Sequence, residues 1–262
     1  MAFRIEDLVS MPFDKSVFSC IQEATNRILA LSNEMDYITL MDNNFQAFNY
    51  DIVNTTAYGR VDFKRINCSF SNFFSSFYLW KEYHKHHYGD IFNNILIRYR
   101  ERNAIFSLGE EMRHYSAHVA FAITKVEYDG IKEIRCLPID AQILLKRAEV
   151  SNHKLNASLR AWLTEKKENA EPIEAEWLVF EFYQICTEIQ NELWSGYIEQ
   201  IHKDLETIAR YFPEGFSNVY NVSISSEDQA THFGLGQIIA CFLKKAAWQY
   251  PKFIPNLYLG KF

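Results

Sequence analysis

The chain has 262 residues, of which 48% are hydrophobic, and a formal net charge of −6. This length fits one large domain or two small ones, and the acidic balance argues against a protein that coats nucleic acid without selectivity. The scarcity of Gly and Pro argues against an all-β or disordered chain, and the absence of a signal-like or membrane-spanning apolar run favours a cytoplasmic protein with no membrane partner.

Hydrophobic residues at three- and four-residue spacing predict helices over the first part of the chain. Glycines mark the expected helix ends, Asn-rich stretches weaken the second helical pattern, and Asp residues mark the expected N-caps. We expect five helices: one from Asp14 to about Leu31, one over 37–57, one from after Gly59 to about Gly89, one from Asp90 to about Tyr99, and one over 104–118.

The character of the sequence changes after residue 118. Residues 119–128 are rich in β-branched and aromatic side chains, and Asp129-Gly130 is typical of a two-residue hairpin turn. Residues 131–137 alternate in polarity and would pair back, and 139–145 would add a third short strand. We therefore predict a small antiparallel β insertion over 119–146.

Helical patterning returns after the insertion. It predicts a helix over 157–167, a long amphipathic helix over 173–211, and a short helical piece over 235–248. The predicted fold is mainly α, a helical bundle in a single domain with a small β-hairpin insertion. Its helical core would be 14–118 and 173–211, and its C-terminal extension 213–262.

Metal and cofactor sites are not indicated. The five cysteines are scattered without a Cys-x-x-Cys pair, which predicts reduced thiols rather than a zinc knuckle or a disulfide framework. His114 and His118 are four residues apart and would share a helical face. Only Glu110 or Glu111 is near enough in sequence to add a third ligand. We expect no metal and no cofactor.

The segment from Leu108 to His118 contains the two residues best suited to chemistry, Arg113 and His118. An arginine guanidinium can bind two phosphate oxygens at once, and a histidine exchanges a proton near neutral pH. In a regular helix, five positions separate the two residues by about 140° around the axis. They can serve one site only if the helix ends or distorts near Ser116, or if two chains build the site together.

The sequence from Arg113 to His118 resembles the Arg-polar-x-x-x-His signature of the HEPN superfamily (higher eukaryotes and prokaryotes nucleotide-binding domains). Upstream, Arg65 and Asn72 lie in a helix that resembles the corresponding helix of bacterial HEPN-type proteins. The resemblance covers about residues 15–130. At His114, the family usually has Asn or Asp.

The resemblance implies a helical bundle that forms a homodimer, with the two Arg–His motifs meeting at the two-fold axis. It also implies a metal-independent endoribonuclease of a toxin–antitoxin or phage-defence system, with RNA as substrate and an antitoxin or defence protein as a further partner. The RNA 2′-OH would be the nucleophile. His118 would act as general base or acid, or orient the phosphate, and Arg113 would stabilise charge on the phosphorane.

Other residues are secondary candidates for the same chemistry. Each has a structural alternative: a core position, a cap, a solvated helix face, or a favourable cation at a helix C-terminus. The supporting candidates are His114, Tyr115, Asn72 and Glu110, and the phosphate-binding candidates are Arg65, His84 and His87.

Two other functions fit the sequence. The first is a catalytically inactive HEPN module that binds nucleotide, RNA or a partner protein, which the net negative charge and His114 favour. The second is a helical adaptor in which the motif is accidental. It predicts that Arg113 and His118 lie apart and outside any dimer groove.

Overall fold

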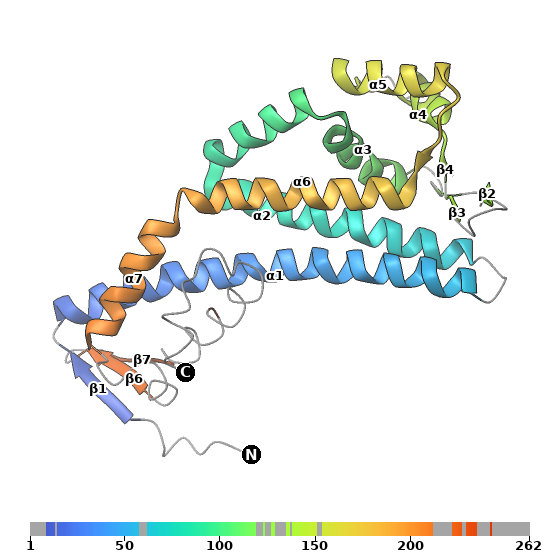
Figure 1. Cartoon of the computed structure of the whole chain (residues 1–262). Helices are drawn as coiled ribbons and strands as arrows, with labels where there is room; N and C mark the ends of the chain where they lie inside the picture. The colour runs from blue at the N-terminus through green and yellow to red at the C-terminus, as the bar shows by residue number, and fades with distance from the viewer. Residues whose placement is uncertain are drawn as a thin grey trace. The chain divides into compact units, whose positions relative to one another are not determined.

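The structure is a computed structural model of the chain. It describes residues 9–13, 15–57, 62–118, 123, 127–128, 135–136, 138–150, 154–211, 222–226, 229–234 and 242. Within this part of the chain there are seven helices and seven short strands (Figure 1), so the prediction of a mainly α fold is confirmed. None of the described helices is long and apolar enough to cross a membrane.

The chain forms two compact units. Unit 1 combines Met1–Asp36 with Trp194–Phe262, and unit 2 comprises Tyr37–Leu193. Helix α1 (Lys15–Ala57) contributes residues to both units, and so does helix α6 (Ala175–Ser195), whose last two residues belong to unit 1.

Unit 2 is built from helices whose first residues follow capping side chains. Asp62, Asn103 and Asn156 each accept hydrogen bonds from backbone N–H groups of the first turn that follows. The expected helix boundary at 104–118 is confirmed, and that at 157–167 differs by one residue. The helices are α2 (Phe63–Arg102), α3 (Ala104–His118), α4 (Ala141–Val150) and α5 (Ala157–Glu168), together with the last part of α1 and most of α6.

A kink divides α2 at Gly89. This residue has φ 50° and ψ −122°, a conformation outside the helical region that side chains strongly disfavour. The sequence predicted that one helix ends at Gly89 and another begins at Asp90, and the kink at Gly89 confirms this break. The kink lets the two segments of α2 lie at different angles and supply side chains to the same part of unit 2.

Two expected helix boundaries are wrong. Residues 14–31 and 37–57 were expected in separate helices, but α1 is continuous over Lys15–Ala57. The predicted helix over 173–211 is divided, because α6 ends at Ser195 and a turn follows at 196–197. In that turn the Tyr197 N–H donates to the Trp194 carbonyl (2.8 Å), which stops the helical pattern of hydrogen bonds.

The third strand expected over 139–145 is also wrong. Only β4 (Pro138–Ile139) is extended, and it pairs antiparallel with β5 (Ile173–Glu174). The chain then enters α4, because the Asp140 carboxylate accepts from the backbone N–H of Gln142 (2.7 Å) and of Ile143 (3.3 Å). An N-cap therefore overrides the β-branched pattern that follows it.

Part of the predicted β insertion lies in a short pair of strands. Strand β2 (Glu127–Tyr128) pairs antiparallel with β3 (Arg135–Cys136). The Asp129-Gly130 turn expected between them lies outside the described residues, as do Asp14, Pro213 and most of 235–248.

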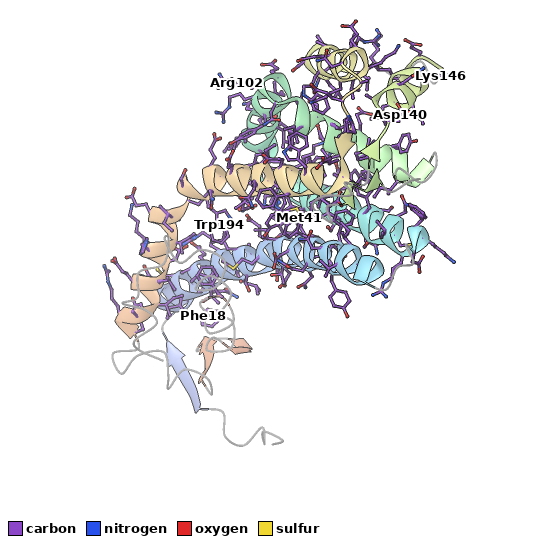
Figure 2. All side chains as sticks on the ribbon, turned by 45° about the vertical axis from the view of Figure 1, so that its right-hand side comes forward. Phe18, Met41, Arg102, Asp140, Lys146 and Trp194 are labelled. Atoms are coloured by element: carbon purple, nitrogen blue, oxygen red, sulfur yellow. The ribbon has the colours of Figure 1, made fainter. Side chains whose placement is uncertain are left out.

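The core of unit 2 is aromatic. The Phe182 ring lies 4.7–6.2 Å from four other phenylalanine rings, at angles from stacked to edge-on. The Trp80 indole N–H donates to Gln190 Oε1 (2.8 Å), which satisfies a buried donor in this core. Met41, labelled in Figure 2, is also fully enclosed. The buried rings are Phe48, Phe70, Phe73, Phe74, Phe77, Trp80, Phe92, Phe106 and Phe182.

Unit 1 joins the two ends of the chain. A sheet of order β1-β6-β7 pairs β1 (Val9–Phe13) parallel to β6 (Val222–Ser226), and β6 antiparallel to β7 (Gln229–Gly234). The sequence patterns did not predict these strands. Helix α7 (Ile198–Tyr211) is amphipathic, and its buried Asp204 accepts two hydrogen bonds from Arg27 of α1 (2.8 and 2.9 Å).

Candidate functional site

Helices α2 and α3 in unit 2 place two pairs of functional side chains next to each other. The Arg113 guanidinium carbon lies 3.4 Å from the centre of the Tyr78 ring, and Lys81 Nζ lies 3.0 Å from Glu110 Oε1. Residue numbers rise on α2 as they fall on α3, so these helices are antiparallel. Pairs three residues apart share a helical face, so the two contacts are neighbours.

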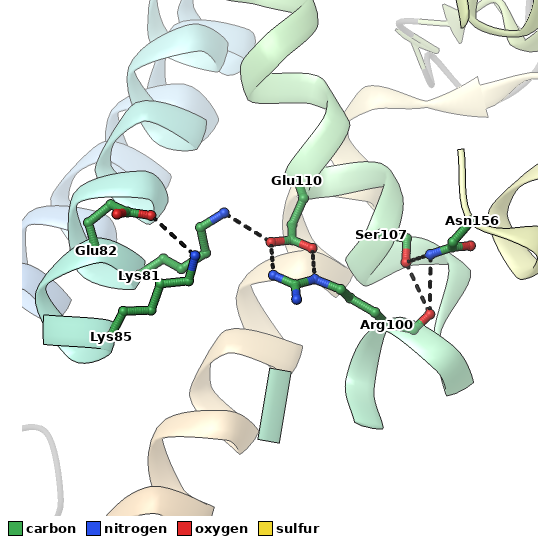
Figure 3. Close-up of polar contacts among 7 residues, drawn as sticks. All are labelled: Lys81, Glu82, Lys85, Arg100, Ser107, Glu110 and Asn156. Carbon is green, nitrogen blue, oxygen red and sulfur yellow. Dashed lines mark hydrogen bonds and ion pairs between the residues drawn. The ribbon is translucent and has the colours of Figure 1, made fainter. Parts of the chain in front are cut away.

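Glu110 binds cations from both segments of α2, as Figure 3 shows. Arg100, after the Gly89 kink, donates from Nε to Oε2 (2.5 Å) and from Nη2 to Oε1 (2.8 Å). Lys81, before the kink, donates to Oε1. One carboxylate therefore joins the two segments of α2 to α3. Lys81, Arg100 and Arg113, with Tyr78 and Glu110, form what we call the cationic cluster.

The electrostatics of the cationic cluster follow from burial and pairing. Burial raises the pKa of the Glu110 carboxyl, but the hydrogen bond from Arg100 and the charge of Lys81 outweigh it and lower the pKa below its usual 4.5. The hydrogen bond to Glu110 likewise raises the pKa of Arg100. Glu110 therefore compensates part of the positive charge of both Lys81 and Arg100.

The Arg113 guanidinium stacks on the Tyr78 ring. Stacking engages the flat face of the guanidinium, whereas its N–H donors lie in the plane of the group. The same side chain can therefore rest on a ring and present a planar fork to two oxygens. A lysine at this position would lose both the stacking and the fork.

Two contacts hold α3 in place on its other sides. A methyl group at Gly109 would lie 2.7 Å from Phe182 Cγ and closer still to Cδ2 and Cε2, so only glycine allows α3 this close to α6. Asn156, at the start of α5, donates from Nδ2 to Ser107 Oγ (2.5 Å), as Figure 3 shows. The helix that contains the Arg–His motif is therefore packed against three others.

Positions 113 and 118 lie on different faces of α3. Helix α3 stays helical through His118, while the side chains of His114 and His118 lie outside what the structure describes. A regular helix places position 118 about 140° around the axis from Arg113. Tyr115 is half-buried and three residues from 118, so it shares the face of the histidine instead.

The structure does not place Asn72 or Arg65 beside Arg113. Asn72 is exposed, and six residues along α2 put it about 120° around the axis from Tyr78, the residue that Arg113 contacts. Arg65 Nε donates to Asp51 Oδ1 (2.6 Å), an ion pair that connects α1 with the start of α2.

The two candidate histidines of α2 have different surroundings. His84 is fully buried against Trp80 and Phe92, and its Nδ1–H donates to the Trp80 carbonyl (2.7 Å), so it is a core residue. His87 is exposed and stacked on Tyr83, with ring centres 4.0 Å apart. Only His87 is placed where a ligand can reach it.

Sequence reasoning missed three members of the cationic cluster and one anchor. Tyr78, Lys81 and Arg100 have no local signature, because they meet Glu110 and Arg113 only through the antiparallel packing of α2 and α3. The anchor is Asn67. Its side-chain amide donates to the Ile123 carbonyl (2.7 Å) and accepts from the Ile123 N–H (3.0 Å). This buried pairing fastens the chain that leaves α3 back onto α2.

Within the described residues, no three His, Cys, Asp or Glu side chains are grouped so as to hold a metal ion. Comparison of the chain with protein-family models, with curated proteins and with solved structures found no match. A proposal for the function therefore depends on the cationic cluster and on the sequence motif from Arg113 to His118.

Proposed function

We propose that the chain is a metal-independent endoribonuclease of the HEPN type that acts on RNA as a homodimer in the cytoplasm, in a toxin–antitoxin or phage-defence setting. The observation that supports it best is Arg113, which is stacked on Tyr78 beside the ion pairs that Lys81 and Arg100 make with Glu110. A planar, immobilised guanidinium is suited to a phosphodiester because it pairs with two of its oxygens.

A homodimer resolves the divergence of Arg113 and His118. On an unbroken α3, positions 113 and 118 lie on different faces, which favours a site shared between two chains over a site within one chain. An isologous dimer presents each surface twice, related by a two-fold axis. Arg113 of one protomer and His118 of its partner then complete each of two equivalent sites.

The reaction in such a site follows from the residue types. His118 accepts the proton of the RNA 2′-OH, and the 2′ oxygen attacks the adjacent phosphorus. The bond from phosphorus to the 5′ oxygen breaks, and the leaving oxygen takes up a proton. Arg113 stabilises the negative charge on the phosphorane oxygens. The products are a 2′,3′-cyclic phosphate and a 5′-OH, and no step requires a metal.

The test is cleavage of end-labelled single-stranded RNA in EDTA, with analysis of the product ends. Arg113→Ala and His118→Ala should each lower the cleavage rate by at least about 100-fold, and Arg113→Lys should lower it less. Arg102→Ala and His202→Ala remove the same side chains elsewhere and should leave the rate unchanged. Unaltered cleavage in both motif variants, or cleavage that depends on added metal, would refute the proposal.

Mixing the two inactive variants tests the composite site. In a mixed dimer, the Arg113→Ala protomer supplies His118 and the His118→Ala protomer supplies Arg113, so one of the two sites is intact. With random exchange of protomers, about a quarter of the wild-type activity should return. No recovery with proven exchange of protomers would place both residues in a site within one chain.

A second candidate function is a binding module without catalysis. The same divergence of Arg113 and His118 on α3 favours it, because a single chain that only binds phosphate needs the cationic cluster and not the histidine. It predicts RNA binding that Arg113→Ala weakens and His118→Ala does not, with intact RNA recovered after prolonged incubation.

A further inference from the structure

Three aromatic rings of unit 2 lie in contact one after another, and we call this series the stack. Tyr37 of α1 lies 4.4 Å from Tyr83 of α2, with the ring planes 30° apart. Tyr83 lies 4.0 Å from His87, with the planes 25° apart. Tyr37 and Tyr83 are half-buried, whereas His87 is exposed. The stack therefore begins between two helices and ends at the surface.

A backbone hydrogen bond fixes the last ring of this stack. His87 Nδ1 lies 3.0 Å from the Tyr83 carbonyl oxygen, and a carbonyl can only accept, so Nδ1 holds the hydrogen. The ring is thereby held over Tyr83 in one orientation. His86, one residue earlier, is also exposed but meets His87 edge-on, with ring centres 5.3 Å apart, and is not part of the stack.

We propose that this stack, Tyr37–Tyr83–His87, is a subsite that binds an unpaired nucleobase of single-stranded nucleic acid by stacking on His87. A base has a flat π-face whatever its identity, and an exposed ring that is already immobilised loses little entropy when a base lies on it. A stack of rings that starts in the protein supports the outermost ring better than a single mobile side chain does.

Charge near the stack indicates that the base, not the phosphate, provides the binding energy. Lys85 is paired with Glu82 at 3.5 Å, and Asp90 is exposed nearby in sequence, so the surrounding residues are not strongly cationic. Phosphate-dominated sites rely on several unpaired cations and lose affinity steeply as salt rises. The subsite should therefore select unpaired bases over a duplex, in which the bases are already stacked.

The choice of nucleic acid as ligand rests on the proposed function, so the probe is single-stranded DNA, which lacks the 2′-OH and is not cleaved. Binding of the full chain to a fluorescein-labelled 12-nucleotide oligodeoxyadenylate is followed by fluorescence anisotropy, with the duplex form as comparison. His87→Ala should weaken binding about tenfold. His87→Phe, which restores a ring, should stay within about threefold of the wild type.

His86→Ala is the matched control, because it removes the same kind of side chain from the neighbouring exposed position. It should change the affinity less than about twofold, and the ratio of the His87→Ala and wild-type dissociation constants should persist from low to moderate KCl. Equal losses in His86→Ala and His87→Ala would show a charge effect and overturn the proposal. So would unchanged binding in His87→Ala, or no binding of the wild type.

The binding and cleavage experiments together distinguish failure of the subsite proposal from failure of the ribonuclease proposal. Oligodeoxyadenylate binding that requires the His87 ring, in a chain that does not cleave RNA, supports the subsite and refutes the nuclease. RNA cleavage that requires Arg113 and His118, with DNA binding indifferent to His87, refutes the subsite alone.

Discussion

Replacement of Gly109 by alanine tests whether α3 is held against α6 as closely as the structure shows. The new methyl group would lie 2.7 Å from Phe182 Cγ and closer to two further ring carbons, well inside ordinary contact distance. The Phe182 ring cannot swing away, because it is fully buried among Phe73, Phe74 and Phe106. Helix α3 must therefore move outward.

The expected magnitude combines two opposing effects. Alanine is a better helix former than glycine, which would stabilise the folded state by about 1 kcal/mol. Overpacking a rigid aromatic core destabilises it by about 1–3 kcal/mol or more, and the overlap with three ring atoms places Gly109→Ala at the upper end. The net expectation is a loss of about 2 kcal/mol.

Urea unfolding followed by far-UV circular dichroism measures this loss. A double-mutant cycle with Phe182→Leu isolates the clash, because the smaller side chain makes room for the methyl group and Gly109→Ala should then cost less than about 0.5 kcal/mol. Gly89→Ala is the contrasting variant. It has open space around the added methyl group and a positive φ of 50°, so its loss should persist in the Phe182→Leu background. If Gly109→Ala were as stable as the wild type or more stable, the close packing of α3 on α6 would be refuted.

Three further predictions concern polar contacts. Glu110→Gln leaves two partly buried cations without their carboxylate and should destabilise the protein by about 2 kcal/mol. The pKa of Glu110 is lower in the folded state than in the unfolded state, so its contribution to the free energy of unfolding is complete above pH 4.5 and is lost as pH falls through the folded pKa. Below pH 4.5, the urea midpoint of the wild type should therefore fall more steeply with pH than that of Glu110→Gln. Asn67→Ala should cost about 2 kcal/mol and accelerate hydrogen exchange at the Ile123 amide, whose acceptor it removes. Arg27→Ala leaves the buried Asp204 carboxylate without its main partner and should cost about 2 kcal/mol, more than the double replacement of both residues by leucine, as thermal unfolding would show.

Local signals were sufficient for much of the helical architecture. Helix α3 has the bounds that its apolar spacing predicts, because Asn103 provides a clear N-cap. The kink at Gly89 was also visible, since glycine followed by Asp90 is a helix end followed by a cap. In both places, side chains within four residues decide the conformation.

The sequence predictions were wrong where one local signal hid another, or where contacts between distant residues determine the secondary structure. Asn44 was expected to weaken the helix over 37–57, but its side-chain amide donates to the Leu40 carbonyl within the helix, which satisfies the polar side chain without ending the helix. Asp140 was an available cap that the strand-like residues after it obscured. The parallel pairing of Val9–Phe13 with Val222–Ser226 joins opposite ends of the chain, and no local pattern contains it.

Only those candidate site residues that lie close together in sequence could be predicted. Arg113 stands out in the sequence because of its spacing from His118, whereas its contact with Tyr78 depends on the antiparallel packing of two helices and has no local signal. His84 shows the converse. A histidine in a cluster with Lys85 looks like a phosphate ligand in sequence, but the 3.6-residue repeat of α2 turns it into the core.

The construction of unit 1 from both ends of the chain has a consequence for biosynthesis. Residues up to Asp36 leave the ribosome first, but their partners begin only at Trp194. At about 5–20 residues per second, the first part waits roughly 10–30 s for them. During that interval the apolar face of α1 around Phe18, Ile21 and Ile28 has none of the α7 residues to cover it, while unit 2 is already complete in sequence. The nascent chain thus exposes these apolar side chains until α7 has been synthesised, and premature termination near residue 193 would make that exposure permanent.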